Sequence, residues 1–348
     1  MLNKILKILS INIVLFSFLF SQNNFSWIGT RNLYNTSNIA TEYIGNSSNC
    51  SILGKNESTK ISSSIFYQNY SWTLWSFSQR GISIQYNKNG LGISANMIGR
   101  GSWKDMVATT ETGDYQKKYK LIFQERFINI TYAKKFYDKL YIGILGKYLN
   151  TQNPERLNFL KDNFGTSIDI GFLYKVFNEL ELGLDIENIL STKIDYVIFD
   201  DFGAWAFANE LPINFNINFI YSINSKIKFD FGIDNLFEDK VYDSNHNAYY
   251  IYKKKYHIGC NWNIYRNLFI NADYYRQRRP TEFTYKADVG KFDYNLYNYF
   301  NFEIYYKIKK YSVNASAKQD NRKEKMERSP IKLKSNTFFY SMSLSYEL

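Results

Sequence analysis

Apolar and polar residues alternate along most of the chain. In the last stretch, SNTFFYSMSLSYEL, every second residue from Phe338 to Leu348 is apolar or aromatic, and most residues between them are small or polar. The segments ELELGLDIEN, INFNINFIY and KIKFDFGIDN show the same period of two. This is the period of a β-strand with one apolar and one polar face. The pattern predicts an all-β protein.

The alternation predicts about fourteen strands, and the connections between them are alternately short and long. The expected strands are residues 60–68, 80–87, 91–99, 126–135, 139–149, 166–177, 179–190, 212–222, 226–236, 249–264, 267–277, 297–308, 310–317 and 335–347. Short turns, such as NKNG at 87–90, alternate with long connections at 69–79, 100–125, 150–165, 191–211, 237–248, 278–296 and 318–334. Both ends of the chain fall on the side of the short turns.

Alternation alone fits either a soluble sandwich, with the apolar face inward, or a membrane barrel, with the apolar face toward lipid. A sandwich has no reason to sort its loops by length, whereas an up-and-down outer-membrane barrel has short periplasmic turns and long outer loops. Mean hydropathy is −0.39 and aromatic residues make up 19% of the chain, which suits a barrel and not a helical bundle. We therefore expect a transmembrane antiparallel up-and-down β-barrel of about 14 strands with an N-terminal plug segment.

Three regions are expected along the chain. Residues 1–22 are typical of a signal peptide, because Lys4 and Lys7 precede an apolar run that is too short to span a bilayer. Residues 23–59 do not alternate and form either a flexible periplasmic tail or a plug inside the barrel. Residues 60–348 are the barrel. The predicted location is the outer membrane of a diderm bacterium, with the lipid bilayer as the first partner.

Charge and cysteine content narrow the function classes. The formal net charge is +11, but no compact stripe of Lys and Arg suggests nucleic-acid binding. Cys50 and Cys260 match no metal spacing, and we expect two isolated thiols, with a disulfide between them as the alternative. No cofactor is expected, because the chain has no phosphate-binding glycine loop and no metal cluster.

Charged residues on the polar faces are the candidate functional residues. We expect a polar network in the lumen, because charged groups inside a protein need partners. Its predicted members are Glu181, Asp185, Glu187, Lys228, Asp230 and Asp234. A cation pathway is the alternative for these residues. The histidines, His246 and His257, do not suggest catalysis, and we expect that the protein is not an enzyme.

Two of the long loops are rich in aromatic residues. NYSWTLWSFSQ carries Trp72 and Trp75, and VIFDDFGAWAFANELP carries Phe202 and Trp205. Exposed aromatic residues in quantity mark contact surfaces. These four residues are candidate contacts for a protein partner, and a packed lid is the alternative.

The strand pairs resemble the PorV/PorQ family, relatives of the FadL-type fourteen-stranded barrels. The resemblance rests on FINITYAKKFYDKLYIGILGKYL, SIDIGFLYKVFNELELGLDIENIL, KYHIGCNWNIYRNLFINADYY and NTFFYSMSLSYEL. Asn49-Cys50-Ser51 stands where the family has an Asn-Pro-Ala-like element, although the proline is absent. The resemblance implies an outer-membrane binding partner in type IX protein secretion or surface attachment, together with other envelope proteins. FadL-type relatives imply the alternative, a transporter of hydrophobic compounds.

Overall fold

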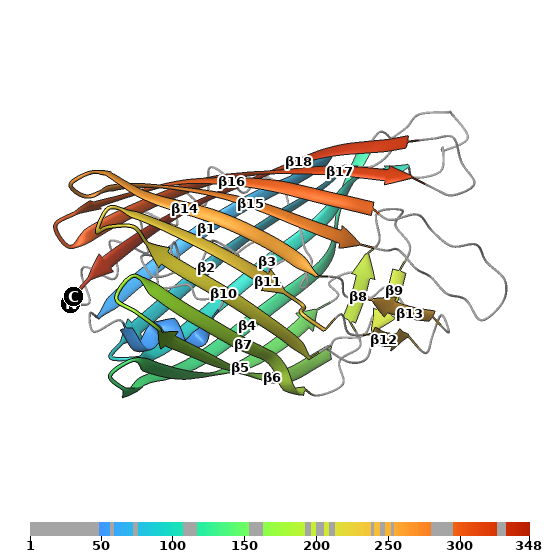
Figure 1. The fold of residues 1–348 in the computed structure, drawn as a ribbon. Helices are drawn as coiled ribbons and strands as arrows, with labels where there is room; N and C mark the ends of the chain where they lie inside the picture. Colours follow the sequence, from blue (N-terminus) through green and yellow to red (C-terminus); the bar gives the residue numbers. More distant parts are fainter. Residues whose placement is uncertain are drawn as a thin grey trace, which may run out of the picture.

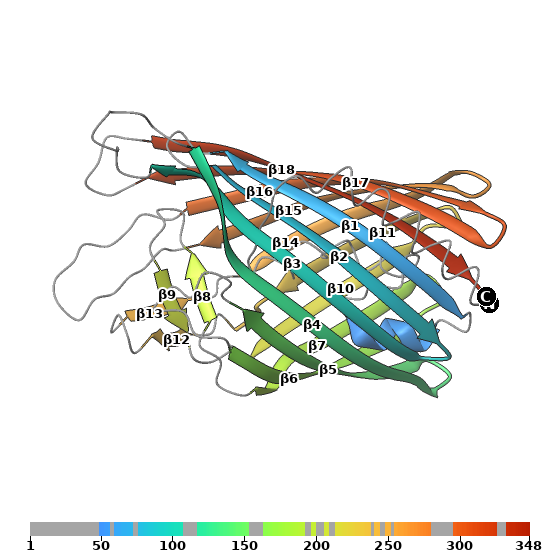
Figure 2. The ribbon, with the colours of Figure 1, turned by 180° about the vertical axis from the view of Figure 1, so that it is seen from behind.

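The molecule is a closed antiparallel β-barrel of fourteen strands (Figure 1 and Figure 2). The computed structural model describes residues 49–55, 59–71, 76–106, 117–152, 163–191, 196–199, 205–208, 213–237, 240–243, 248–251, 254–279, 295–325 and 332–348. The barrel strands are β1 (Lys60–Ser71), β2 (Ser76–Lys88), β3 (Leu91–Met106), β4 (Lys117–Tyr137), β5 (Leu140–Gln152), β6 (Asn163–Lys175), β7 (Leu180–Ser191), β10 (Asn214–Ser222), β11 (Ile227–Asp234), β14 (Lys255–Tyr265), β15 (Leu268–Arg279), β16 (Asn295–Ile308), β17 (Tyr311–Lys325) and β18 (Lys332–Glu347). The predicted fold class and strand number are confirmed.

The first and last barrel strands close the sheet. β1 pairs with β18 along its whole length, from Lys60 opposite Glu347 to Ser71 opposite Asn336. Every other barrel strand pairs with the barrel strands before and after it in the chain. The C-terminal alternation is thus explained, because β18 has two neighbours and presents one face to each side of the wall.

Two small hairpins account for the main error in the predicted strands. β8 (Tyr196–Phe199) pairs with β9 (Trp205–Ala208), and β12 (Lys240–Asp243) pairs with β13 (Ala248–Ile251). Neither pair belongs to the barrel sheet. The predicted strand 249–264 is therefore wrong as one element, since residues 249–251 belong to β13 and β14 begins at Lys255. The alternation breaks down here, because four apolar or aromatic residues at 249–252 are followed by three lysines at 253–255, so the sequence does carry a mark of the break.

Several barrel strands are longer than their sequence pattern indicates. β3 ends at Met106 and β4 begins at Lys117, whereas alternation predicted 91–99 and 126–135. β17 likewise extends to Lys325 instead of residue 317. Backbone pairing continues after the apolar alternation ends, because strand extensions outside the hydrocarbon do not need an apolar face.

Three of the six short turns use residues with left-handed backbone conformations. Asn89 and Gly90 have φ values of 48° and 80° in the β2–β3 turn, which is the sequence preference of a tight hairpin. An ideal Cβ on Gly90 would overlap the carbonyl oxygen of Ala133, so a side chain does not fit there. Arg266 and Lys309 have φ values of 43° and 52° in two further turns.

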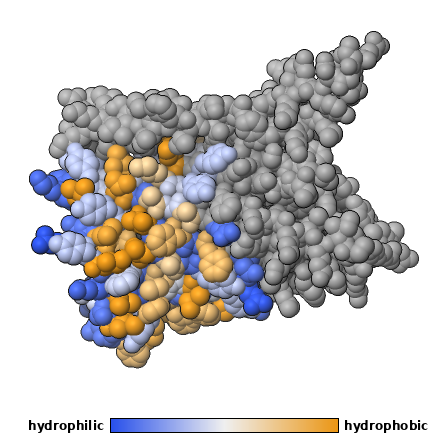
Figure 3. Space-filling view, turned by 90° about the horizontal axis from the view of Figure 1, so that it is seen from above, coloured by the Kyte–Doolittle hydropathy of each residue, from blue (hydrophilic) through white to orange (hydrophobic). Residues whose placement is uncertain are grey.

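The two faces of the wall differ sharply in chemistry. In β11, Phe229 and Phe231 are exposed on the outer face, whereas Asp230 between them is buried. Figure 3 shows that apolar side chains gather in a band on the outer surface, with hydrophilic residues beyond it at the end of the short turns. This arrangement is that of a barrel whose outer face meets lipid, and it places the chain in the outer membrane.

Among the described residues, no helix is both long and apolar enough to cross a membrane.

Candidate functional site in the barrel lumen

A short 3₁₀-helix, η1 (Cys50–Lys55), lies inside the barrel near the end of the short turns (Figure 1). Residues Cys50 to Leu53 are buried against the inner faces of β4, β5 and β6. Residues 23–59 were predicted to be either a tail or a plug, and residues 49–55 of this segment lie in the lumen. Residues 1–48, which include the predicted signal peptide, lie outside the described residues.

Asn49 attaches this segment to the barrel wall. Its Nδ2 donates to the carbonyl oxygens of Phe172 at 3.2 Å and Leu184 at 3.3 Å. Its Oδ1 accepts hydrogen bonds from the backbone N–H and the hydroxyl of Ser51, at 3.0 and 2.6 Å. The Asn49 side chain is buried. One amide group therefore joins η1 to both β6 and β7 and also orders the start of the helix.

Two glycines in the wall make room for η1. An ideal Cβ on Gly143 of β5 would lie 2.6 Å from the carbonyl carbon of Cys50 and from the nitrogen of Ser51. A Cβ on Gly171 of β6 would overlap the Asn49 side chain. Real Cβ atoms do not approach backbone this closely, so only glycine permits η1 to lie flat on this wall. We call Gly143 and Gly171 the glycine seat.

An ion pair fixes the C-terminal end of η1, and Cys50 at its N-terminal end is buried. Lys55 Nζ lies 2.9 Å from Glu181 Oε2, which joins η1 to β7. Burial raises the pKa of the Cys50 thiol, and the carboxylates of Asp185 and Asp169 raise it further. Cys50 is therefore protonated and unreactive while η1 is seated. Cys50 and Cys260 are both free thiols, which confirms the prediction of two isolated cysteines.

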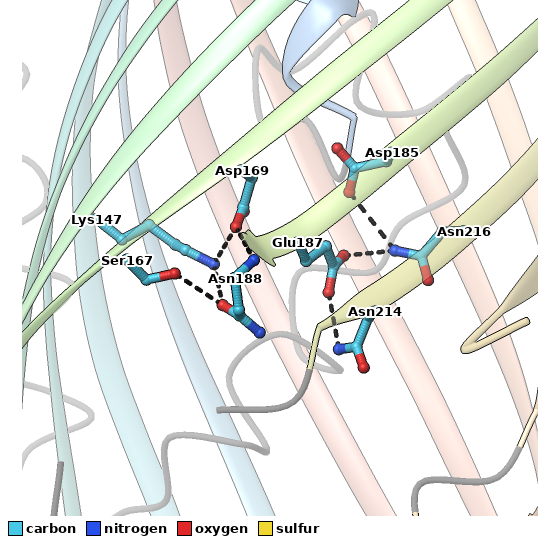
Figure 4. Close-up of polar contacts among 8 residues, drawn as sticks. All are labelled: Lys147, Ser167, Asp169, Asp185, Glu187, Asn188, Asn214 and Asn216. Carbon is cyan, nitrogen blue, oxygen red and sulfur yellow. Dashed lines mark hydrogen bonds and ion pairs between the residues drawn. The ribbon is translucent and has the colours of Figure 1, made fainter. Parts of the chain in front are cut away.

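A polar network of residues from β5, β6 and β7 is centred on Asn188 of β7 (Figure 4). Lys147 Nζ lies 2.7 Å from Asp169 Oδ1 and donates to Asn188 Oδ1 at 2.8 Å. Ser167 donates to the same oxygen at 2.9 Å, and the Asn188 N–H donates to Asp169 at 2.8 Å. Asn188 has a φ of 58°, and the pairing of β6 with β7 shifts at this point. The network thus stabilises a bulge in the wall.

The neighbouring carboxylates of β7 bond to β10. Glu187 accepts from Asn214 at 3.1 Å and from Asn216 at 2.6 Å, and Asp185 accepts from Asn216 at 3.5 Å. These contacts are drawn in Figure 4. Hydrogen bonds from amide groups offset the cost of burying both carboxylates.

A second group of buried carboxylates lies on β11, β15 and β16. Asp273 accepts from Asn271 at 2.8 Å and from Asn301 at 3.0 Å, and Glu303 accepts from Asn314. His257 Nε2 lies 3.7 Å from Asp230 Oδ2. A Cβ on Gly259 would overlap the carboxylates of both Asp230 and Asp273, so these two groups approach each other above this glycine.

The predicted lumen residues fall into separate groups. Glu181 bonds to η1, Asp185 and Glu187 bond to β10, and Asp230 lies beside His257. Asp234 pairs with Lys255 at 2.6 Å. Lys228 occupies a partly exposed position opposite Asn261. The described residues contain no group of three or more His, Cys, Asp or Glu side chains placed to hold a metal ion.

Three of the four predicted partner-contact aromatics, Trp72, Trp75 and Phe202, lie outside the described residues. Trp205 is the first residue of β9, opposite Phe199 in register. Their proposed role in protein contact stays a prediction.

Sequence reasoning missed Asp169, Asn188, Asp273 and Glu303 as members of the lumen groups. Asp169, Asp273 and Glu303 occupy polar positions in alternating segments, so that signal was present in the sequence. Asn188 directly follows Glu187, which is one position too early for the alternation of Gly183, Asp185 and Glu187. That break in period marks the bulge.

No protein-family model matches the chain, and no curated protein matches it by sequence. Solved structures do match its fold. A FadL homologue from Pseudomonas aeruginosa has a TM-score of 0.56 at 10% identity, over 88% of this chain and 94% of the other. A mutant of the TodX monoaromatic hydrocarbon channel has a TM-score of 0.57 at 12% identity, over 94% and 96%.

The Ralstonia pickettii toluene transporter TbuX has a TM-score of 0.52 at 11% identity, over 89% of this chain and 93% of the other. Two of these three similar structures are described as a channel or a transporter, and none of the three is described as an enzyme. Identity at this level is evidence for the fold alone. The chain therefore has the architecture of the FadL-type outer-membrane barrels, with a segment from its N-terminal region folded into the lumen.

Proposed function

We propose that this protein is a channel that carries small hydrophobic compounds across the outer membrane. The observation that supports it most is the position of η1. A specific socket, made by the glycine seat and two backbone carbonyls that accept from Asn49, holds this segment in the lumen near the periplasmic mouth. A barrel that contains a seated segment is suited to controlled passage. The similar FadL-type structures support hydrophobic cargo, since two of those named above are described as a monoaromatic hydrocarbon channel and a toluene transporter.

The lumen face is not wholly polar. Leu173 lies opposite Gly183, Ile220 lies opposite Asp230, and both leucine and isoleucine are buried. Ile52 and Leu53 of η1 add further apolar surface inside the barrel. Alternation in the sequence assigns the apolar side chains to the lipid face and polar side chains to the lumen, and a polar lumen by itself does not favour a hydrophobic cargo. These four buried side chains show that apolar groups pack on the inner side of the wall as well as on the lipid face.

Uptake of radiolabelled toluene by whole cells tests the proposal. The chain is produced in a Gram-negative host, and initial uptake is compared with that of cells that carry the empty vector. Expression should raise the rate severalfold. A folded barrel in the outer membrane that leaves toluene uptake at the vector level would contradict the proposed function.

The secretion and surface-attachment role implied by the PorV/PorQ resemblance stays a prediction. It requires stable protein partners, whereas two of the similar solved structures are described as a channel and a transporter. Affinity purification from detergent-solubilised envelope separates the two roles. Transport predicts that the barrel is recovered alone, whereas a secretion role predicts that other envelope proteins are recovered with it in fixed ratio.

A further inference from the structure

The end of the barrel that carries the short turns has an excess of exposed basic residues. In the described part of this end, the exposed basic residues are Lys88, Lys134, Lys135, Lys139, Lys226, Arg266, Lys309 and Lys310. The exposed acidic residues there are Asp138 and Glu179. We call the eight basic residues the basic rim. Its charge favours an anionic partner.

The basic rim follows the circumference of the barrel. Lys88 lies at the β2–β3 turn, Lys139 at the β4–β5 turn and Lys226 at the β10–β11 turn. Arg266 and Lys309 extend the series to the β14–β15 and β16–β17 turns. Of the six short turns, only the β6–β7 turn lacks a basic residue of the rim. A binding site for one protein would gather its charges on one side, whereas this distribution follows the plane of the membrane.

Exposed aromatic side chains lie next to the rim. Phe136, Tyr137, Phe177 and Tyr265 are each more than 60% exposed at the short turns. The Arg266 guanidinium lies over the Tyr265 ring, 5.3 Å from its centroid. Aromatic rings at this position prefer the headgroup layer of a bilayer. The basic groups beside them therefore lie at the depth of lipid phosphates.

The rim retains its positive charge after its ion pairs are counted. Lys135 pairs with Asp138 at 3.2 Å, in an exposed position where such a pair is weak. Glu347 is engaged by Lys307 at 2.7 Å, and Lys307 is not part of the rim. The remaining exposed acidic residue, Glu179, lies in the one turn without a rim residue. Nothing among these contacts neutralises the rim as a whole.

We propose that the basic rim binds the phosphate groups of anionic phospholipids in the periplasmic leaflet of the outer membrane. Juxtamembrane basic residues attract anionic lipid headgroups, and the attraction decreases within a Debye length. The aromatic neighbours keep the rim at the headgroup level, so the phosphates meet the charges without a change in the fold. This role does not depend on the transported compound.

Electron paramagnetic resonance of spin-labelled lipids tests the proposal on the full barrel in phosphatidylcholine vesicles. Labelled phosphatidylglycerol should associate with the protein about fivefold more strongly than labelled phosphatidylcholine at low salt. The ratio of phosphatidylglycerol association to phosphatidylcholine association should fall toward one in about 1 M salt, where the Debye length is about 3 Å. Replacing Lys139, Lys226, Lys309 and Lys310 together by Gln should remove most of the preference. The matched variant with Arg at the same four positions should retain it, because charge is kept.

Equal association of the two lipids with the unaltered protein would overturn the proposal, as would a preference that the four Gln substitutions leave unchanged. A third outcome would also overturn the proposal: the barrel shows no lipid preference, and an acidic envelope protein binds to it only when the rim is intact. The rim would then be a binding site for that protein. The electrophoretic mobility of unheated samples, compared with that of heated samples, verifies that each variant forms a folded barrel. Toluene uptake measures a different property, so failure of either proposal leaves the other standing.

Discussion

The buried pair of Lys147 and Asp169 shows how single residues stabilise the wall at the bulge. Asp169 is almost completely buried, and it accepts from both the Lys147 ammonium and the Asn188 N–H. Removing the cation from such a pair leaves a buried carboxylate with fewer partners, and this costs more than the pair contributes when intact. The side chain of Lys147 keeps 16% exposure, which reduces the cost.

We expect Lys147→Met to lower the free energy of unfolding by about 3 kcal/mol. The double variant Lys147→Met/Asp169→Leu should recover much of this loss, because it removes both charges at once. Urea titration in phospholipid vesicles, followed by tryptophan fluorescence, measures both values. Similar stability of the single variant and the unaltered protein would show that water solvates Asp169 in the lumen.

The exposed pair of Lys135 and Asp138 is the control for this experiment. Its side chains are 49% and 101% exposed. Lys135→Met should leave the urea midpoint unchanged, because exposed ion pairs contribute little.

At the scale of elements, η1 and the glycine seat form one unit. η1 is too short to be stable alone, so its position depends on Asn49, Lys55 and the space above Gly143 and Gly171. Backbone of η1 lies where a side chain at Gly143 would be. Any side chain there must displace the helix or deform β5.

We expect Gly143→Ala to displace η1, at a cost of about 1–3 kcal/mol for the overlap. Cys50 then becomes accessible, and its rate of maleimide labelling should rise about ten- to a hundredfold. Gly146→Ala is the matched control in the same strand, because its Cβ would meet only the Ile130 carbonyl oxygen at 3.8 Å. It should leave labelling unchanged. Equal labelling of the two variants would contradict the seated position of η1.

The whole molecule is organised by which face of the wall meets lipid. Ala95 of β3 is exposed on the outer face between Ile84 of β2 and Ile128 of β4. Ser94, the next residue, faces the lumen opposite Gln85 and Asn129. Ala95 therefore faces the hydrocarbon, whereas its neighbour Ser94 in the same strand faces the lumen.

We expect Ala95→Arg to destabilise the barrel in vesicles by about 2–4 kcal/mol, since a cation on the lipid face is costly near the middle of the bilayer. Ser94→Arg introduces the same side chain into the lumen and should cost less than about 1 kcal/mol. Guanidinium unfolding of both variants in vesicles gives the comparison. The opposite order of stabilities would show that the two faces have been assigned incorrectly.

Sequence periodicity was sufficient to predict the number of barrel strands, which face of each strand is apolar, and at which end of the barrel the short turns lie. It was sufficient because each strand of a membrane barrel meets lipid on one face, so the apolar period repeats in every strand. It also predicted that Glu181, Asp185 and Asp230 lie on polar faces. The predicted strand 249–264 nevertheless joined β13 to β14, although the alternation breaks down at residues 249–255, where four apolar or aromatic residues precede three lysines.

The partners of each lumen residue depended on the tertiary structure. Lys147 meets Asp169 and Asn188 because strands stagger around a closed wall, and that stagger is not visible within any one segment. The seat of η1 likewise joins Asn49 to carbonyls more than 120 residues away. The chain alone determined that a barrel forms in lipid, since that follows from local alternation. Closure of the barrel decided which polar groups meet inside it, because only the register of all fourteen strands brings them within bonding distance.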